Sequence, residues 1–217
     1  MIEWYRLHDS LDEIIADTVR MIAAALDDNG LAESVDVLGY NEAFRSVTGL
    51  DAMSATIDEL ADAAAADASL RSAIGNDRNA WLDLLMSETV VPTFDAEKLT
   101  VIRHYPADQA ALARLSPERP EVADRFEVFH RGLELANGYV ELTDADEQEA
   151  RFRRDLEKRS ANNQFLPSPD EQLLAAIRHG LPPCSGVAAG LDRLLMLATE
   201  SDDIRDVMSF PQGRTNG

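Results

Sequence analysis

The sequence predicts an α+β fold in which helices flank an antiparallel sheet. Three stretches carry this prediction: an alternating apolar and polar pattern in residues 125–144, a small-residue run before an apolar helix in residues 185–197, and an amphipathic helix near the start. Alternation with period two is typical of half-buried strands, and apolar spacings of three and four are typical of a packed helix. The chain has 217 residues, of which 45% are hydrophobic, enough for one sizeable core.

Composition narrows the class of protein before any motif is considered. The formal net charge is −20, and Lys98 and Lys158 are the only lysines. Such an acidic surface repels nucleic acid by default, because phosphate binding relies on basic patches. Cys184 is the single cysteine, which excludes an intrachain disulfide and a cysteine-based zinc cluster. No apolar run is long enough to span a bilayer and no signal-like segment follows Met1, so we expect a cytoplasmic protein without a membrane partner.

The first elements are a strand and a core helix. Residues 1–7 predict a strand on which Glu3 and Tyr5 share one face at a spacing of two. An edge strand with an exposed acid would show the same pattern. Residues 10–26 predict a helix with a capping box between Ser10 and Glu13 and an apolar stripe that faces the core.

Residues 36–95 predict a helical insertion, with helices over residues 40–47, 56–66 and 79–88. Leu99 to His104 alternates and predicts a further strand. A lone histidine such as His104 is more often structural than a ligand-binding group.

Three acidic residues recur every seven positions in the alternating stretch: Glu127, Glu134 and Glu141. Seven is odd, so on an ideal strand they would alternate between the two faces. A turn or bulge at Gly132 or Gly138 resets that phase and would turn all three acids toward one cleft. A solvated hairpin with acidic tips is the alternative.

The C-terminal third predicts helices at residues 147–161, 169–179 and 202–207, and a frayed tail at residues 212–217. The first of these helices interleaves acids with the densest basic patch of the chain. That pattern favours a salt-bridged exposed helix over a docking face.

Ser185 to Leu197 predicts a strand that runs into a helix. Small residues such as Gly186 and Gly190 let a ligand approach the backbone closely. Arg193 supplies a planar, permanently charged fork that suits phosphate. A tight strand–helix packing joint with a surface ion pair is the alternative.

These residues resemble a known family. GVAAGLDRLLML (residues 186–197) resembles motif 3 of the class II aminoacyl-tRNA synthetases. FEVFHRGLELANGYVELTD (residues 126–144) resembles the strand pair before it in the lysine-specific branch. The opening IEWYR, CSGVAAGLDRL and ELANGYVELTDADEQEARF fit the elongation factor P–lysine ligases, paralogues of lysyl-tRNA synthetase without an anticodon-binding domain. The resemblance covers nearly the whole chain, closely from about residue 99, and implies one partial class II synthetase-like catalytic domain over residues 1–217.

The resemblance implies ATP-dependent activation of lysine as lysyl-adenylate, with Mg²⁺ bridging the phosphates. Glu127 and Glu134 would hold the metal, because hard cations prefer carboxylate oxygens. Arg193 would pair with the γ-phosphate and offset charge as pyrophosphate leaves. Gln109 and Ala110 would lie near the cleft. The implied catalytic residues are Arg193 and Glu134, the ATP-binding residues are Glu127, Glu134, Gly190 and Arg193, and the substrate-binding residues are Glu3, Tyr5, Asn137, Tyr139, Glu141 and Ala188.

Glu141 would pair with the ε-ammonium of the substrate, since a substrate without that amine leaves a carboxylate unpaired. Ala188 stands where lysyl-tRNA synthetases usually have glycine and the elongation factor P ligases have alanine. The resemblance therefore implies lysine or β-lysine as the substrate and a lysine side chain of elongation factor P as the acceptor. Transfer to tRNA is disfavoured by the acidic charge and by the absence of an anticodon-binding domain.

The sequence also departs from the family. Motif 1 and the first half of motif 2, with its α-phosphate-binding arginine, have no counterpart in residues 1–217. Losing one such charge-stabilising donor costs on the order of 100- to 1,000-fold in rate, so we expect these residues alone to be weakly active or inactive. A homodimer is expected only with the motif 1 segment present. A lysyl-tRNA synthetase fragment and a non-catalytic synthetase-like binding module are the alternatives.

Overall fold

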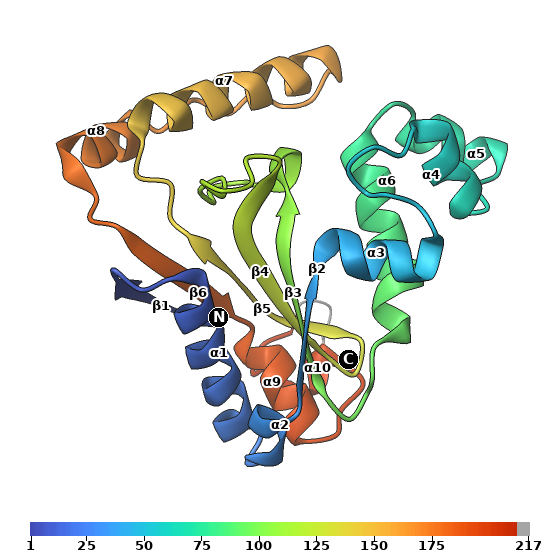
Figure 1. The fold of residues 1–217 in the computed structure, drawn as a ribbon, viewed down its shortest axis with the longest axis vertical. Helices are drawn as coiled ribbons and strands as arrows, with labels where there is room; N and C mark the ends of the chain where they lie inside the picture. Colours follow the sequence, from blue (N-terminus) through green and yellow to red (C-terminus); the bar gives the residue numbers. More distant parts are fainter. Residues whose placement is uncertain (212–217) are drawn as a thin grey trace.

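A six-stranded sheet forms the centre of the part described by the computed structural model, which covers residues 1–211 (Figure 1). The strand order is β1-β6-β5-β4-β3-β2. The pairs from β1 to β3 are antiparallel, as predicted, whereas β2 pairs with β3 in parallel, so the sheet is mixed. The strands are β1 (Ile2–Leu7), β2 (Val35–Gly39), β3 (Leu99–Pro106), β4 (Val122–His130), β5 (Leu133–Val140) and β6 (Cys184–Ala189).

One face of the sheet is covered by α1 (Leu11–Ala25), α2 (Gly30–Glu33) and α9 (Leu191–Ala198) (Figure 1). The predicted capping box is present, because Ser10 Oγ accepts from Glu13 N and the Glu13 carboxylate accepts from Ser10 N. The apolar stripe of α1 packs on alternate residues of β4, β5 and β6, such as Phe126, Leu135 and Val187. This core buries one side of the central strands and leaves their polar residues on the other side.

A helical segment covers the opposite face at the β2–β3 end of the sheet (Figure 1). Its core contains Trp81 and Phe44 and packs against Ile102, Tyr105 and Phe129 of the sheet. The segment begins at Tyr40 and not at residue 36, because residues 35–39 form strand β2. It contains α3 (Tyr40–Thr48), α4 (Ile57–Ala63), α5 (Ala68–Ile74) and α6 (Arg78–Leu85), followed by the π-helical turn η1 (Met86–Val90) and the 3-10 turn η2 (Val91–Thr93).

The helices α7 (Ala145–Ala161) and α8 (Glu171–Gly180) form an arm away from the sheet (Figure 1). Helix α7 carries the predicted salt bridges, for example Arg159 to Asp155 and Arg153 to Glu149, which fits the exposed-helix interpretation. Arg151 anchors the arm, since its Nη1 donates to the Ala113 carbonyl at 2.7 Å. Two short elements are η3 (Ala107–Gln109) and α10 (Ile204–Val207), and the tail predicted at residues 212–217 lies outside the described residues.

The β4–β5 hairpin contains the two phase changes that the acidic spacing requires, one at the Gly132 turn and one at a bulge. Val128 pairs with Ala136 and Phe129 pairs with Glu134, so β5 carries one extra residue, Leu135, at a bulge. The expected reset at Gly132 is confirmed for the step from Glu127 to Glu134, because the turn pairs Phe129 with Glu134 and so puts both acids on one face. The expected reset at Gly138 is wrong, since the bulge at Leu135 makes the step from Glu134 to Glu141. Gly132 has φ of +75°, which favours glycine.

Gly138 has a packing role. A Cβ atom there would lie 2.6 Å from the Phe126 ring and 2.7 Å from the Gly186 carbonyl oxygen. Only glycine lets β5 lie this close to its neighbours.

Within residues 1–211, no helix has both the length and the apolar character needed to cross a membrane.

Candidate active site

The predicted substrate-binding residues lie together in one cavity of about 360 Å³ on the face of the sheet that α1 does not cover. We call this cavity the Glu141 pocket. Its floor comes from β1, β5 and β6, and part of its wall comes from the loop after η3. The lining residues are Glu3, Tyr5, Ala111, Arg125, Asn137, Tyr139, Glu141, Gly186, Val187 and Ala188.

Strand register explains why residues so distant in sequence meet here. Glu3 lies opposite Ala188, and Ala188 lies opposite Asn137, which in turn pairs with Glu127. Two residues further along each strand, the same strands align a second row of four residues on this face. That row consists of Tyr5, Gly186, Tyr139 and Arg125.

Gly186 gives the pocket its depth. A Cβ atom at this position would lie 2.5 Å from Glu141 Oε1 and 2.6 Å from the Tyr5 ring. Both side chains therefore lie directly over the β6 backbone, and any larger residue would displace them.

Glu141 is the most perturbed acid of this pocket. Burial raises its pKa from the ordinary 4.5 to about 7. Among residues 1–211, no cation or hydrogen-bond donor pairs with its carboxylate. Burial also raises the pKa of Tyr139 to about 12, and the Glu141 charge adds to that shift. A half-buried carboxylate without a partner is suited to bind an ammonium group supplied from outside.

Glu127 and Glu134 line a second cavity of about 290 Å³, which we call the Glu127 pocket. It lies where the helical segment meets β3, β4 and β5. The hydroxyls of Tyr40 and Tyr105 are buried without a hydrogen-bond partner in residues 1–211, and both residues line this cavity. The full lining is Tyr40, Asp83, Met86, Ser87, Val91, Tyr105, Arg125, Glu127, Phe129, Gly132 and Glu134.

Glu127 differs from Glu141 in having partners of its own. Its Oε1 accepts from Arg125 Nη2 at 2.6 Å and from Asn137 Nδ2 at 3.0 Å. Burial raises the pKa of Glu127 and the neighbouring Glu134 charge adds to this, while the Arg125 guanidinium opposes the rise. The net direction is upward, because desolvation outweighs the single cation.

Arg193 lies beside Glu134 and lines neither of the two cavities. Its Nη1 donates to the Glu134 carbonyl at 2.6 Å and lies 3.6 Å from Glu134 Oε2. Gly190 is the N-cap of α9, its N–H donates to the Leu135 carbonyl, and a Cβ there would lie 3.5 Å from Arg193 Cδ. Glu134 thus contacts Arg193 and also lines the same cavity as Glu127.

Residues 1–211 contain no group of three or more histidine, cysteine or acidic side chains arranged to hold a metal ion. Two carboxylates in one cavity still fit Mg²⁺, which is usually bound by one or two carboxylates together with substrate phosphates. Both hydrogen bonds to Glu127 end on Oε1, so neither involves Oε2.

Arg125 lines both cavities but was not predicted as a site residue. Its spacing from Glu127 could have indicated it, because residues two apart on a strand share a face. Ala111, which lines the Glu141 pocket, was not predicted either. Gln109 and Ala110, expected near the cleft, are buried and line neither cavity, but the Gln109 carbonyl accepts a hydrogen bond from Arg125, which lines both.

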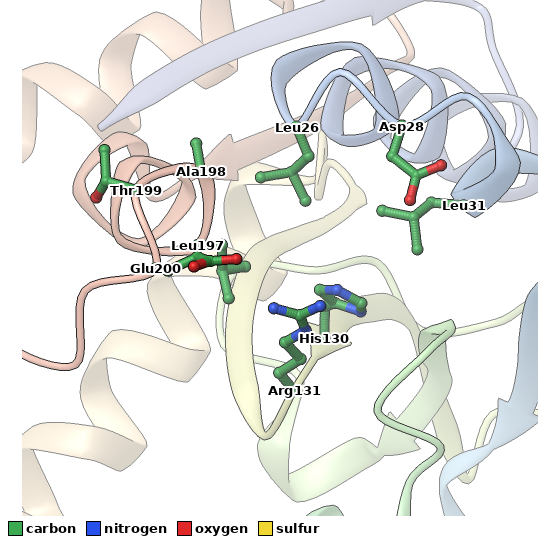
Figure 2. A pocket seen from close by; sticks show the side chains of 9 residues that line it. All are labelled: Leu26, Asp28, Leu31, His130, Arg131, Leu197, Ala198, Thr199 and Glu200. Carbon is green, nitrogen blue, oxygen red and sulfur yellow. The ribbon is translucent and has the colours of Figure 1, made fainter.

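A third cavity lies at the far end of the sheet from the α7–α8 arm (Figures 1 and 2). The end of α1 and the start of α2 line one side, the end of α9 lines another, and the β4–β5 turn supplies His130 and Arg131 (Figure 2). His130 Nδ1 is already bonded to the Lys98 carbonyl at 2.9 Å. None of the predicted site residues lines this cavity.

The fold and the site define the class of protein. The family model of class II tRNA synthetases (D, K and N) matches residues 1–214, and the chain belongs to this family. Among similar curated proteins is the elongation factor P–(R)-β-lysine ligase of Sodalis glossinidius, 42% identical over 211 residues, which are 97% of this chain and 64% of that protein. The proteins of the same name from Hamiltonella defensa and Pectobacterium carotovorum are 40% and 41% identical over 99% and 97% of this chain. The chain spans 64–65% of the length of these three relatives.

Proposed function

We propose that this chain is the lysine-activating part of a ligase that modifies elongation factor P. In the proposed reaction, the carboxylate of lysine or β-lysine attacks the α-phosphate of ATP. An aminoacyl-adenylate forms and pyrophosphate leaves. The amine of a lysine side chain on elongation factor P then attacks the activated carbonyl, and AMP leaves.

The Glu141 pocket is the observation that carries this proposal. Its free, half-buried carboxylate lies among two tyrosines and an asparagine, and a second acid, Glu3, lines the same cavity. A lysine side chain brings one ammonium to such a pocket and its α- or β-amino group brings another. Binding the ammonium removes the cost of burying Glu141 unpaired, whereas a substrate without the amine leaves that cost in place.

The Glu127 pocket supports a role for ATP. Glu127 and Glu134 would hold Mg²⁺, which when bound would offset the charge of the phosphates. Arg193, half-exposed at the edge of this region, would pair with the terminal phosphate. Gly190 would let the nucleotide approach the start of α9.

The names of these relatives support elongation factor P as the acceptor and β-lysine as one substrate. They give no support to the alternative of a lysyl-tRNA synthetase fragment, which we do not propose. A non-catalytic module that retains the lysine pocket is the second candidate, because the Glu141 pocket could bind an ammonium group without the Glu127 pocket.

Two assays test the proposal. Calorimetry with lysine, β-lysine and norleucine measures whether the pocket requires the amine, and we expect binding of at least one lysine isomer and none of norleucine. Pyrophosphate exchange into ATP, dependent on the same isomer, separates the ligase from the binding module. Equal binding of lysine and norleucine would contradict both candidate functions, the ligase and the binding module.

A further inference from the structure

We propose that Arg125 is a positioning residue that forms the shared wall of the two pockets and fixes the side chains of Asn137 and Glu127 on either side of it. The proposal deepens the proposed function, since it concerns the same site. Arg125 is the residue that lines both the Glu141 pocket and the Glu127 pocket on β4. Its side chain is 18% exposed.

Each nitrogen of the Arg125 guanidinium donates one hydrogen bond. Nη1 donates to the Gln109 carbonyl at 2.7 Å, Nε donates to Asn137 Oδ1 at 3.3 Å, and Nη2 donates to Glu127 Oε1 at 2.6 Å. The group also lies 4.5 Å from the centroid of the Tyr105 ring. A planar fork held on three edges and one face has little freedom to rotate.

Asn137 closes the arrangement. Its Nδ2 donates to the same Glu127 Oε1 at 3.0 Å, while its Oδ1 accepts from Arg125. The amide orientation is therefore fixed from both ends, with the amide nitrogen toward the acid and the oxygen toward the cation. Because Asn137 lines the Glu141 pocket and Glu127 lines the other, Arg125 links their geometries.

The link extends into the helical segment. Gln109 presents its carbonyl to Arg125, and its Nε2 donates to Asp83 Oδ1 of α6 at 2.7 Å. Asp83 lines the Glu127 pocket, so a ligand in that pocket would contact the hydrogen-bond network at Asp83 and at Glu127. Buried networks of this kind act as units, and deletions within them are not additive.

Substitution of Arg125 tests the proposal. Arg125→Lys keeps a positive charge but not the fork, and Arg125→Met keeps only the aliphatic length. The matched control is Arg103→Met on neighbouring β3, which breaks a 2.6 Å ion pair with Asp12 outside both pockets. All variants are made in the 217-residue chain.

The first readout needs no ligand. The side-chain amide resonances of Asn137, assigned through Asn137→Ser, should shift in both Arg125 variants, while the backbone amide spectrum keeps the native pattern. In Arg103→Met they should stay in place. Unchanged Asn137 resonances in Arg125→Met would overturn the proposal whatever the function of the protein.

The second readout is lysine affinity by calorimetry without ATP or metal. We expect a loss of about 10-fold in Arg125→Met and a smaller loss in Arg125→Lys, with Arg103→Met within about 2-fold of wild type. The double variant Arg125→Met, Asn137→Ser should bind no more weakly than Asn137→Ser alone. Full additivity of the two losses would refute the positioning role. If the wild-type chain binds no lysine isomer while the Asn137 resonances respond as expected, the proposed function fails and the positioning role stands.

Discussion

The two pockets on the open face of the sheet treat their carboxylates in opposite ways. Glu127 accepts hydrogen bonds from Arg125 and Asn137, so the fold itself supplies its cation. Glu141 is half-buried with no such partner within residues 1–211, and its pKa is raised to about 7. We infer that the carboxylate without a cation partner, Glu141, is the one that a cationic substrate completes.

The largest expected effect comes from neutralising Glu141, the carboxylate without a cation partner. Glu141→Gln keeps the shape of the side chain and removes its charge. Truncating one partner of a buried charge pair costs roughly 2–5 kcal/mol, so lysine affinity should fall by at least about 30-fold. Calorimetry measures the loss, and Glu134→Gln, outside this pocket, is the control. Retention of wild-type lysine affinity in Glu141→Gln would contradict the role of Glu141 in binding the substrate amine.

The same substitution should stabilise the ligand-free chain. A carboxyl group whose folded-state pKa is raised contributes stability below its ordinary pKa, and loses it as pH rises through about 7. Because Gln resembles the neutral acid, Glu141→Gln should gain about 1–2 kcal/mol at pH 8, after allowance for solvent exposure, and about nothing at pH 4. Urea unfolding at both pH values measures the gain. A loss of stability at pH 8 would count against an unpaired Glu141.

The next effect concerns the backbone under the pocket. Gly186→Ala places a Cβ atom 2.5 Å from Glu141 Oε1 and 2.6 Å from the Tyr5 ring, so both side chains must move. We expect a loss of stability of about 1–3 kcal/mol and a loss of lysine affinity of about 10-fold or more. Gly190→Ala is the control, since its nearest contact would be Arg193 Cδ at 3.5 Å. Equal lysine affinities in the two variants would contradict the packing role of Gly186.

Lysine affinity should also depend on pH. With a pKa of about 7, Glu141 is about 9% ionised at pH 6 and about 91% ionised at pH 8. Since the ammonium binds the ionised form, affinity should be about 10-fold weaker at pH 6 than at pH 8. Calorimetry at half-unit intervals gives the profile, and Glu141→Gln should flatten it. A profile of equal slope in that variant would assign the titration to another group.

The smallest expected effect comes from substituting Glu127, whose carboxylate already accepts two hydrogen bonds. Glu127→Gln keeps an oxygen for Arg125 and Asn137, so lysine affinity without ATP should change by less than about 3-fold. The thermal shift produced by ATP with Mg²⁺ should shrink, because a carboxylate ligand is lost. A larger loss of lysine affinity than in Glu141→Gln would reverse the roles given to the two pockets.

Much of the fold and part of the site could be predicted from the sequence because local sequence patterns encode them. The capping box of α1, the strand–helix joint at Gly190 and the shared face of Glu3 and Tyr5 all depend on residues close in sequence. The six substrate-binding residues were instead implied by the family resemblance, and all six line one cavity.

What escaped prediction depends on contacts between distant segments. The parallel pairing of β2 depends on its neighbour β3. In this pairing Val35 lies opposite Leu99, which is more than 60 residues further along the chain. The bulge at Leu135 shows only in the pairing with β4, and the sequence wrongly indicated Gly138 as the place of that second phase change. The role of Arg125 requires Gln109 and Asn137 to be brought to it by two other elements.

The most direct test is the titration of the Glu141 side chain itself. The chain is labelled with ¹³C in glutamate, its carboxyl resonance is assigned through Glu141→Gln, and the pH midpoint is followed with and without saturating lysine. The account predicts a midpoint near 7 for the free chain that falls by at least about one unit when lysine is bound. A midpoint that stays the same with lysine present would contradict the pairing of Glu141 with the substrate amine.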